Sequence, residues 1–161
     1  ELEEQLKGAV EREEFLEAAR LRDELSLARM DDEAGVLCAN NEFYAAFRDC
    51  DSDRMADLWL NSRRSVCAHP GWPEIQGYEA IVASWEGILS SRPGMDIECH
   101  RPAIDFRGDS ARLVCVERLD AGRAEVVAAN QFESTGDGWK MVYHAAGIWE
   151  SPGDAAAAWH E

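Results

Sequence analysis

The last third of the chain contains four apolar segments of strand length, which constrain the fold more than any other feature. They occupy 95–108, 110–122, 123–138 and 139–149 and are rich in Val, Ile and aromatic residues. The sequences RGDS, DAGR and STGDG separate them, and such sequences are typical of tight turns. Because short turns join antiparallel neighbours, these segments are predicted to form an antiparallel meander.

Helical patterns come before these strands. Apolar residues recur at helical spacing in 35–51, 51–60 and 78–91, while 63–69 has the pattern of a strand and 70–77 that of a loop. Three helices followed by a meander predict an α+β domain. We expect a strongly bent, cone-like antiparallel sheet packed on the three helices, with a mouth open to a ligand.

The first thirty residues have a strongly helical composition, with two apolar stripes that are slightly out of phase. Two short antiparallel helices or one longer amphipathic helix would explain the pattern. The sequence MDDEAG then interrupts it. We therefore expect a helical hairpin at 1–30, a linker at 31–35, the cone-like domain at 36–150 and a tail at 151–161.

Charge and cysteine content exclude several classes of function. The net charge of -16 argues against nucleic acid or an anionic membrane surface as partner, and no run of eighteen apolar residues predicts membrane insertion. The five cysteines include no CxxC pair, so neither a zinc site nor a disulfide framework is expected. We expect a reducing compartment, and no metal or cofactor.

The segment 67–89, CAHPGWPEIQGYEAIVASWEGIL, concentrates aromatic residues and a histidine around a Pro-Gly turn. In one interpretation His69 is an acid–base catalyst assisted by Tyr44 and Asn130. In the other, the segment is pocket architecture, and His69 hydrogen-bonds within its own loop. The residues expected to line a ligand pocket are Trp72, Trp85, Glu117 and His144.

The segment FLEAARLRDEL at 15–25 resembles the UVR motif of UvrB and UvrC, which also occurs in McsA and in Clp chaperone-associated proteins. One departure is GAV before the turn, where the family more often has a second Ala pair. The resemblance implies a helical hairpin used for protein contacts, including self-pairing. It places partner binding on Phe15, Ala18, Ala19, Arg22, Asp23 and Leu25.

Three blocks resemble the SnoaL-like branch of the nuclear transport factor two-like superfamily: 40–59, 67–89 and 130–147. The resemblance implies pairing through the outer face of the sheet, and hence a homodimer. Catalytic members place an acid–base residue at the end of the first strand, an Asp in the ketosteroid-isomerase-like enzymes. His69 holds that position here, which is a departure from the family. The combination with a UVR hairpin resembles plastid proteins of green algae and plants, which implies the chloroplast stroma.

Two hypotheses about function follow. In the first, the chain is an adaptor or regulatory protein whose hairpin docks to a protein partner, such as Clp-type chaperone–protease machinery. The other domain then serves dimerisation or the binding of a small hydrophobic ligand. In the alternative, the chain is a cofactor-free isomerase, cyclase or dehydratase that uses His69 on a hydrophobic carbonyl substrate.

Overall fold

The computed structural model describes residues 1–91 and 96–147. The chain divides into two compact units, Glu1–Leu37 and Cys38–Glu161, and one long helix contributes to both. The predicted tail at 151–161 lies outside the described residues. Within them, no helix combines the length and apolar character that crossing a membrane requires.

The first unit begins as a helical hairpin. Helix α1 (Leu2–Glu11) is followed by a turn in which Glu13 has a φ of 58°, and α2 begins at Phe15. Ala9, Ala18 and Leu21 are buried together, with Leu2 and Leu6 packed beside them. Of the two arrangements that the sequence allows, the structure has two helices.

The interruption expected at 31–35 is not present. Helix α2 continues without a break from Phe15 to Asp49. The prediction of a non-helical linker at 31–35 is therefore wrong, because these residues are helical. The acidic residues of this segment are compatible with a helix, and Gly35 costs only about 1 kcal/mol in a helix interior. Packing of the flanking turns is sufficient to offset that cost.

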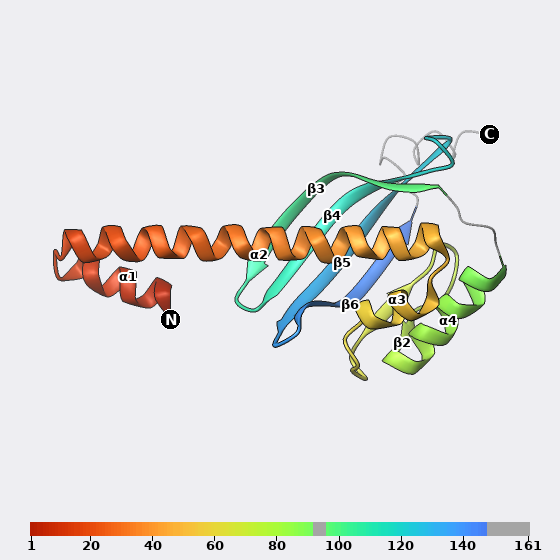
Figure 1. The fold of residues 1–161 in the computed structure, drawn as a ribbon, viewed down its shortest axis with the longest axis horizontal. Coiled ribbons are helices and arrows are strands. Elements are labelled where there is room, and N and C mark those ends of the chain that lie inside the picture. Colours follow the sequence, from red (N-terminus) through yellow and green to blue (C-terminus); the bar gives the residue numbers. More distant parts are fainter. Residues whose placement is uncertain (92–95, 148–161) are drawn as a thin grey trace, which may run out of the picture. The chain divides into compact units, whose positions relative to one another are not determined.

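In the described part of the second unit, six strands form one sheet (Figure 1). Its strands are β1 (Val66–Ala68), β2 (Ile75–Gln76), β3 (Ile97–Arg107), β4 (Ser110–Leu119), β5 (Ala124–Thr135) and β6 (Gly138–Gly147). The order across the sheet is β2-β1-β6-β5-β4-β3, and β3 to β6 form the predicted antiparallel meander. Two features are additional: β1 pairs in parallel with β6, and the expected loop contains β2.

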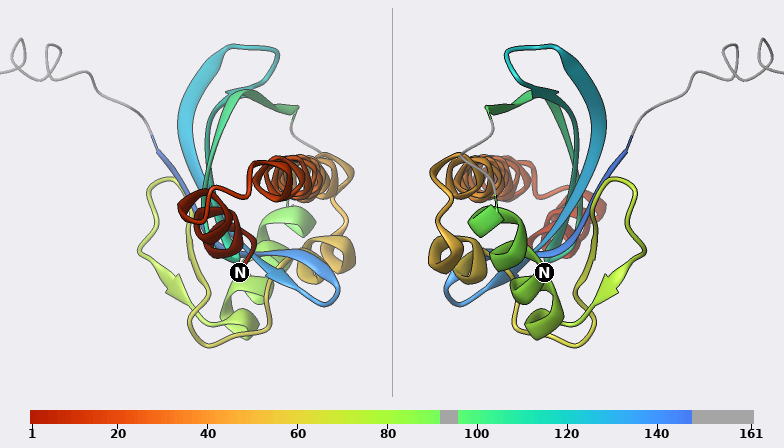
Figure 2. Two further views of the ribbon diagram at one scale, coloured as in Figure 1. Left: turned by 90° about the vertical axis from the view of Figure 1, so that its left-hand side faces the viewer. Right: turned by 90° about the vertical axis from the view of Figure 1, so that its right-hand side faces the viewer.

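The sheet bends around helices, which confirms the predicted α+β class. Helix α3 (Ser52–Leu58), helix α4 (Tyr78–Ser91) and the last turns of α2 lie on its concave side (Figure 2). The pairing register shifts between β3 and β4 and between β5 and β6. These shifts are consistent with β-bulges, which increase local twist. The core therefore lies between the helices and the concave face, where Phe43, Ile81, Leu113 and Phe132 are buried.

Candidate functional site

A cavity of about 560 Å³ opens between the helices and the concave face of the sheet in the second unit. This volume lies within the range of small-molecule sites. Its walls are largely apolar, and four aromatic rings line it: Phe43, Phe47, Trp72 and Trp85. The polar side chains at its surface include His69, Glu117 and His144.

Glu117 is a buried carboxyl group at this cavity, and only 3% of its surface is exposed. Side chains along β4 point alternately to the two faces of the sheet, and Glu117 points to the concave face. There the Tyr44 hydroxyl of α2 donates a hydrogen bond of 2.8 Å to Glu117 Oε1. Burial raises the pKa of Glu117 to about 7, although the Tyr44 hydrogen bond acts to lower it. Near neutral pH this carboxyl group therefore exists in both protonation states.

His144 of β6 is fixed by a chain of two amides. The Nδ2 of Asn130 donates to Asn40 Oδ1 at 2.8 Å, and Asn130 Oδ1 lies 2.7 Å from His144 Nδ1. Because that oxygen accepts, Nδ1 carries the proton and Nε2 is the acceptor nitrogen. Burial, followed by the nearby His69, lowers the pKa of His144 to about 3, so the ring is neutral at physiological pH.

His69 has a different set of contacts. Its Nε2 lies 3.0 Å from Ser84 Oγ, and that hydroxyl donates its own proton to the Ile81 carbonyl at 2.7 Å. His69 Nε2 therefore donates to Ser84. The ring also stands edge-on to Trp85, with centroids 4.5 Å apart, and to Trp72 at 5.3 Å. These contacts hold the ring firmly, and burial lowers its pKa.

The two tryptophans wall the cavity without filling it. Trp85 is buried, and its indole N–H is enclosed without a hydrogen bond to any of the described residues. Its contribution to the cavity surface is therefore the ring. Trp72 follows the Pro-Gly turn and is 53% exposed, which places it at the rim.

The structure brings five of the seven predicted site residues to this cavity: His69, Trp72, Trp85, Glu117 and His144. The other two, Tyr44 and Asn130, do not line it but hold Glu117 and His144 in place. Sequence reasoning missed Asn40, Ser84 and the two Phe walls as site residues. Asn40 carried a detectable signal, because it is a polar residue within the apolar face of a helix.

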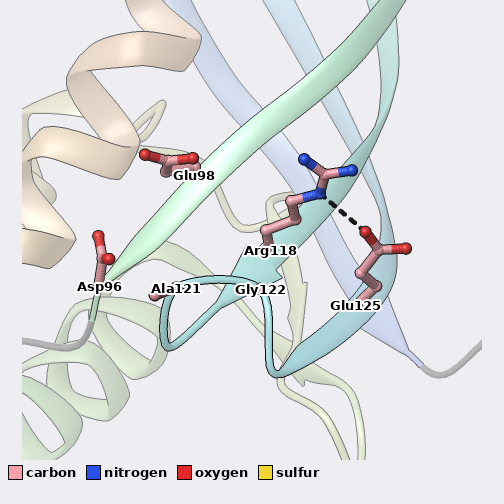
Figure 3. A pocket seen from close by; sticks show the side chains of 6 residues that line it. All are labelled: Asp96, Glu98, Arg118, Ala121, Gly122 and Glu125. Carbon is pink, nitrogen blue, oxygen red and sulfur yellow. Dashed lines mark hydrogen bonds and ion pairs between the residues drawn. The ribbon is translucent and has the colours of Figure 1, made fainter.

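A second hollow, of about 440 Å³, lies beside the ends of β3, β4 and β5 and is polar. Arg118 and Glu125 form an ion pair at 2.8 Å. Figure 3 shows this pair with Asp96 and Glu98 set apart from it. Such exposed ion pairs contribute little to the stability of the fold. In the part of the chain that the structure describes, no group of three or more His, Cys, Asp or Glu residues is suited to a metal ion.

The predicted partner-binding residues of the hairpin divide between its interior and its surface. Ala18 is buried against α1, and Ala19 and Leu25 are partly buried. Phe15 is 72% exposed, and Arg22 and Asp23 are exposed and ion-paired with each other. Only part of the motif is therefore available to a partner.

A second apolar stripe on α2 was missed by the sequence reasoning. Leu16, Leu27 and Met30 are 92%, 65% and 66% exposed, and their spacing places them within about a sixth of a turn of one another. The same spacing places Ala18 and Leu21 on the opposite side of the helix, where they pack on α1. We call Leu16, Leu27 and Met30 the uncovered stripe.

Comparison with known families agrees with this architecture. Residues 36–148 match the SnoaL-like domain, and residues 1–29 match the UvrB/uvrC motif. The chain belongs to the SnoaL-like domain family, and it carries a UVR motif at its N-terminal side.

Individual relatives are similar over most of this chain. The F-box protein SKIP8 of Arabidopsis thaliana is 27% identical over 113 residues, which are 70% of this chain and 49% of SKIP8. The chain thus spans about half the length of this curated relative. An NTF2-like protein from Streptomyces avermitilis, proposed to be a dehydratase, superposes with a TM-score of 0.69 at 26% identity and covers 75% of this chain and 98% of its own.

The similarity to a third protein concerns the fold alone. A protein from Thiobacillus denitrificans, proposed to be a calcium/calmodulin-dependent protein kinase type II association domain, is 24% identical and has a TM-score of 0.63. The match covers 70% of this chain and 93% of the other. Proteins of different described roles thus share this architecture, so function has to be argued from the sites.

Proposed function

We propose that this protein is an adaptor or regulatory protein. Its UVR hairpin docks to a protein partner, and its SnoaL-like domain dimerises and binds a small ligand. The observation that carries the proposal is the uncovered stripe, because large apolar side chains gathered on one face of an exposed helix are typical of a protein-binding surface.

The charge of the hairpin indicates the character of the partner. Residues 1–34 contain 12 acidic and 5 basic residues, so two hairpins in contact would repel each other. A partner with a basic rim around an apolar groove fits this surface better than a second copy does. The resemblance to Clp-associated UVR proteins makes a Clp-type chaperone the first candidate.

Binding to a purified Clp-type chaperone tests this part of the proposal. We expect the double variant Leu16→Ser and Leu27→Ser to bind at least about tenfold more weakly than the wild type, because two anchor side chains are removed from the contact. Both residues are exposed, so the variant should fold normally. Fluorescence anisotropy of the labelled chain measures the affinity.

The matched control is Gln5→Ser, which changes an exposed residue of α1 and leaves the uncovered stripe intact. Its affinity should equal that of the wild type. Equal affinities for all three proteins would contradict docking through the stripe, and absence of binding by any of them would exclude the chaperone as the partner.

The outer face of the sheet supports dimerisation of the SnoaL-like domain. Strand pairing brings a set of partly exposed apolar residues together on this face: Val114, Val116, Val127, Ala129, Tyr143 and Ala145. A two-fold related copy could cover such a surface with the same residues from both chains.

We expect the wild type to have the mass of a dimer in light scattering, and Val116→Glu to have that of a monomer. A carboxylate at the centre of an apolar contact is costly to bury. Val10→Glu is the control, because it adds the same charge at an exposed position of the hairpin. A monomeric wild type, or a dimeric Val116→Glu, would contradict this surface as the interface.

The cavity supports the ligand-binding part of the proposal better than it supports catalysis by His69. That histidine donates its Nε2 proton to Ser84 and stands edge-on to two tryptophans, contacts that are typical of a structural residue. The cavity itself remains open, with a buried carboxyl group at its wall. Ligand binding requires only these features.

The chloroplast stroma is the proposed site of action. The resemblance to plastid UVR proteins and the similarity to a protein of Arabidopsis thaliana support it. Free thiols are present at Cys38, Cys67, Cys99 and Cys115, which suits a reducing compartment. Imaging of the fluorescently tagged protein in plant cells tests this location, and a signal confined to the cytosol would exclude it.

A further inference from the structure

The polar atoms that Glu117 and His144 leave available to a ligand are hydrogen-bond acceptors. Tyr44 occupies Oε1 of Glu117, which leaves Oε2 for a ligand. Asn130 occupies Nδ1 of His144, which leaves the lone pair of Nε2. When Glu117 is ionised, both available atoms accept and neither donates. A ligand that complements them has to supply hydrogen-bond donors or a positive charge.

The charges around Glu117 lead to the same conclusion. Neither Lys nor Arg is present among the described residues that line the cavity. The titratable groups that interact with Glu117 are Tyr44 of α2, Cys99 of β3 and Cys115 of β4. His144 of β6 and His69 after β1 share the cavity with it. None of them is positive at neutral pH, because burial keeps both histidines neutral. A buried carboxylate without a cation is costly, so a cationic ligand would relieve that cost.

The aromatic residues supply the rest of the site. Phe43, Phe47, Trp72 and Trp85 come from α2, from the turn after β1 and from α4, so their rings approach the cavity from different sides. The faces of such rings attract organic cations, and recognition of quaternary ammonium groups commonly uses several rings together. The chain's net charge of -16 also favours the approach of a cation.

We propose that this cavity binds an organic cation of the alkylammonium class, with Glu117 as its counter-ion and the four aromatic rings around it. The inference rests on the proposed ligand-binding function of the SnoaL-like domain and names the chemical class of its ligand. A hydroxyl or N–H group on the same ligand would donate to Nε2 of His144.

The experiment compares choline with 3,3-dimethyl-1-butanol, in which carbon replaces the charged nitrogen and the shape is kept. NMR titration of the full chain at pH 8 measures both affinities. We expect choline to bind at least about tenfold more tightly than the alcohol, because only choline is attracted by the carboxylate and the rings. Its affinity should rise about eight- to tenfold from pH 6 to pH 8 as Glu117 ionises.

Glu117→Gln is the decisive variant, since it removes the charge and keeps the shape. We expect it to weaken choline binding about tenfold or more and to leave binding of the alcohol within about twofold. The control Glu86→Gln changes an exposed carboxylate of α4 and should alter neither affinity. A thermal melt of each variant confirms that it is folded.

Each other outcome overturns a defined part of the proposal. If the alcohol binds as tightly as choline and Glu117→Gln changes neither affinity, the cavity takes neutral ligands. The ligand-binding function then stands, and the cation inference is wrong. If neither compound binds at concentrations that saturate ordinary weak sites, both the inference and the proposed ligand-binding function are rejected.

Discussion

Replacing Phe43 with alanine is expected to lower the free energy of unfolding by about 3–5 kcal/mol, because the substitution opens a void at the centre of the core. Phe43 is 1% exposed. Its ring contacts Tyr44 at 5.1 Å, Trp85 at 5.5 Å and His144 at 4.9 Å between centroids. Chemical denaturation of the wild type and the variant measures the difference.

Phe15→Ala is the matched control for this change. It removes the same ring from the same helix, but at a position that is 72% exposed, so we expect a loss of less than about 0.5 kcal/mol. A loss below about 1 kcal/mol for Phe43→Ala would mean that the ring does not organise the core. So would equal losses for the two variants.

Glu117→Gln is expected to stabilise the protein at pH 8 and to change its stability little at pH 4.5. The pKa of Glu117 is about 7 in the folded state against an ordinary value of 4.5. Between these values the folded protein binds more protons than the unfolded chain does, so stability falls as pH rises through this window. The glutamine variant lacks that loss.

The gain for Glu117→Gln at pH 8 is at most about 3 kcal/mol, from the free-energy equivalent of the pKa shift. Gln also keeps an oxygen that accepts from Tyr44. Denaturation at pH 4.5, 6 and 8 measures the difference between variant and wild type. Glu86→Gln, which changes an exposed carboxylate, is the matched control. A wild type more stable than Glu117→Gln at pH 8 would contradict a carboxylate buried without a counter-ion.

Much of the fold could be predicted because its local signals are strong. The four strands of the meander are separated by turn sequences. Strands β3 to β5 lie within their predicted ranges, and β6 begins one residue before its own. The parallel pairing of β1 with β6 could not be predicted, since it joins Val66 to Tyr143 without any local signal. The continuity of α2 through Gly35 was also missed, because an acidic run and a glycine resemble a linker.

The candidate site was predictable only in part. Residue type and position led to His69, Trp85 and His144, but strand parity could not decide which face Glu117 occupies, because β4 has apolar residues on both faces. The hydrogen bond from Tyr44 to Glu117 joins residues 73 positions apart, and only the fold brings them together.

The uncovered stripe was missed for a different reason. Apolar residues lie on both sides of the first turns of α2, and the sequence pattern does not distinguish the side that packs on α1 from the side left exposed. Burial of Ala18 and Leu21 resolves this, because it assigns the hairpin seam to one side. Leu16, Leu27 and Met30 then remain as the surface for a partner.

The central claim, that a protein partner covers the uncovered stripe, is tested most directly by site-specific photo-crosslinking. A photoreactive phenylalanine analogue is placed at Leu27 in one protein and at Glu86, an exposed position of α4, in another. Each is irradiated with the purified Clp-type chaperone. The account predicts an adduct of chain plus chaperone from position 27 and none from position 86. No adduct at position 27, equal adducts at both positions, or only an adduct of twice the chain mass would contradict it.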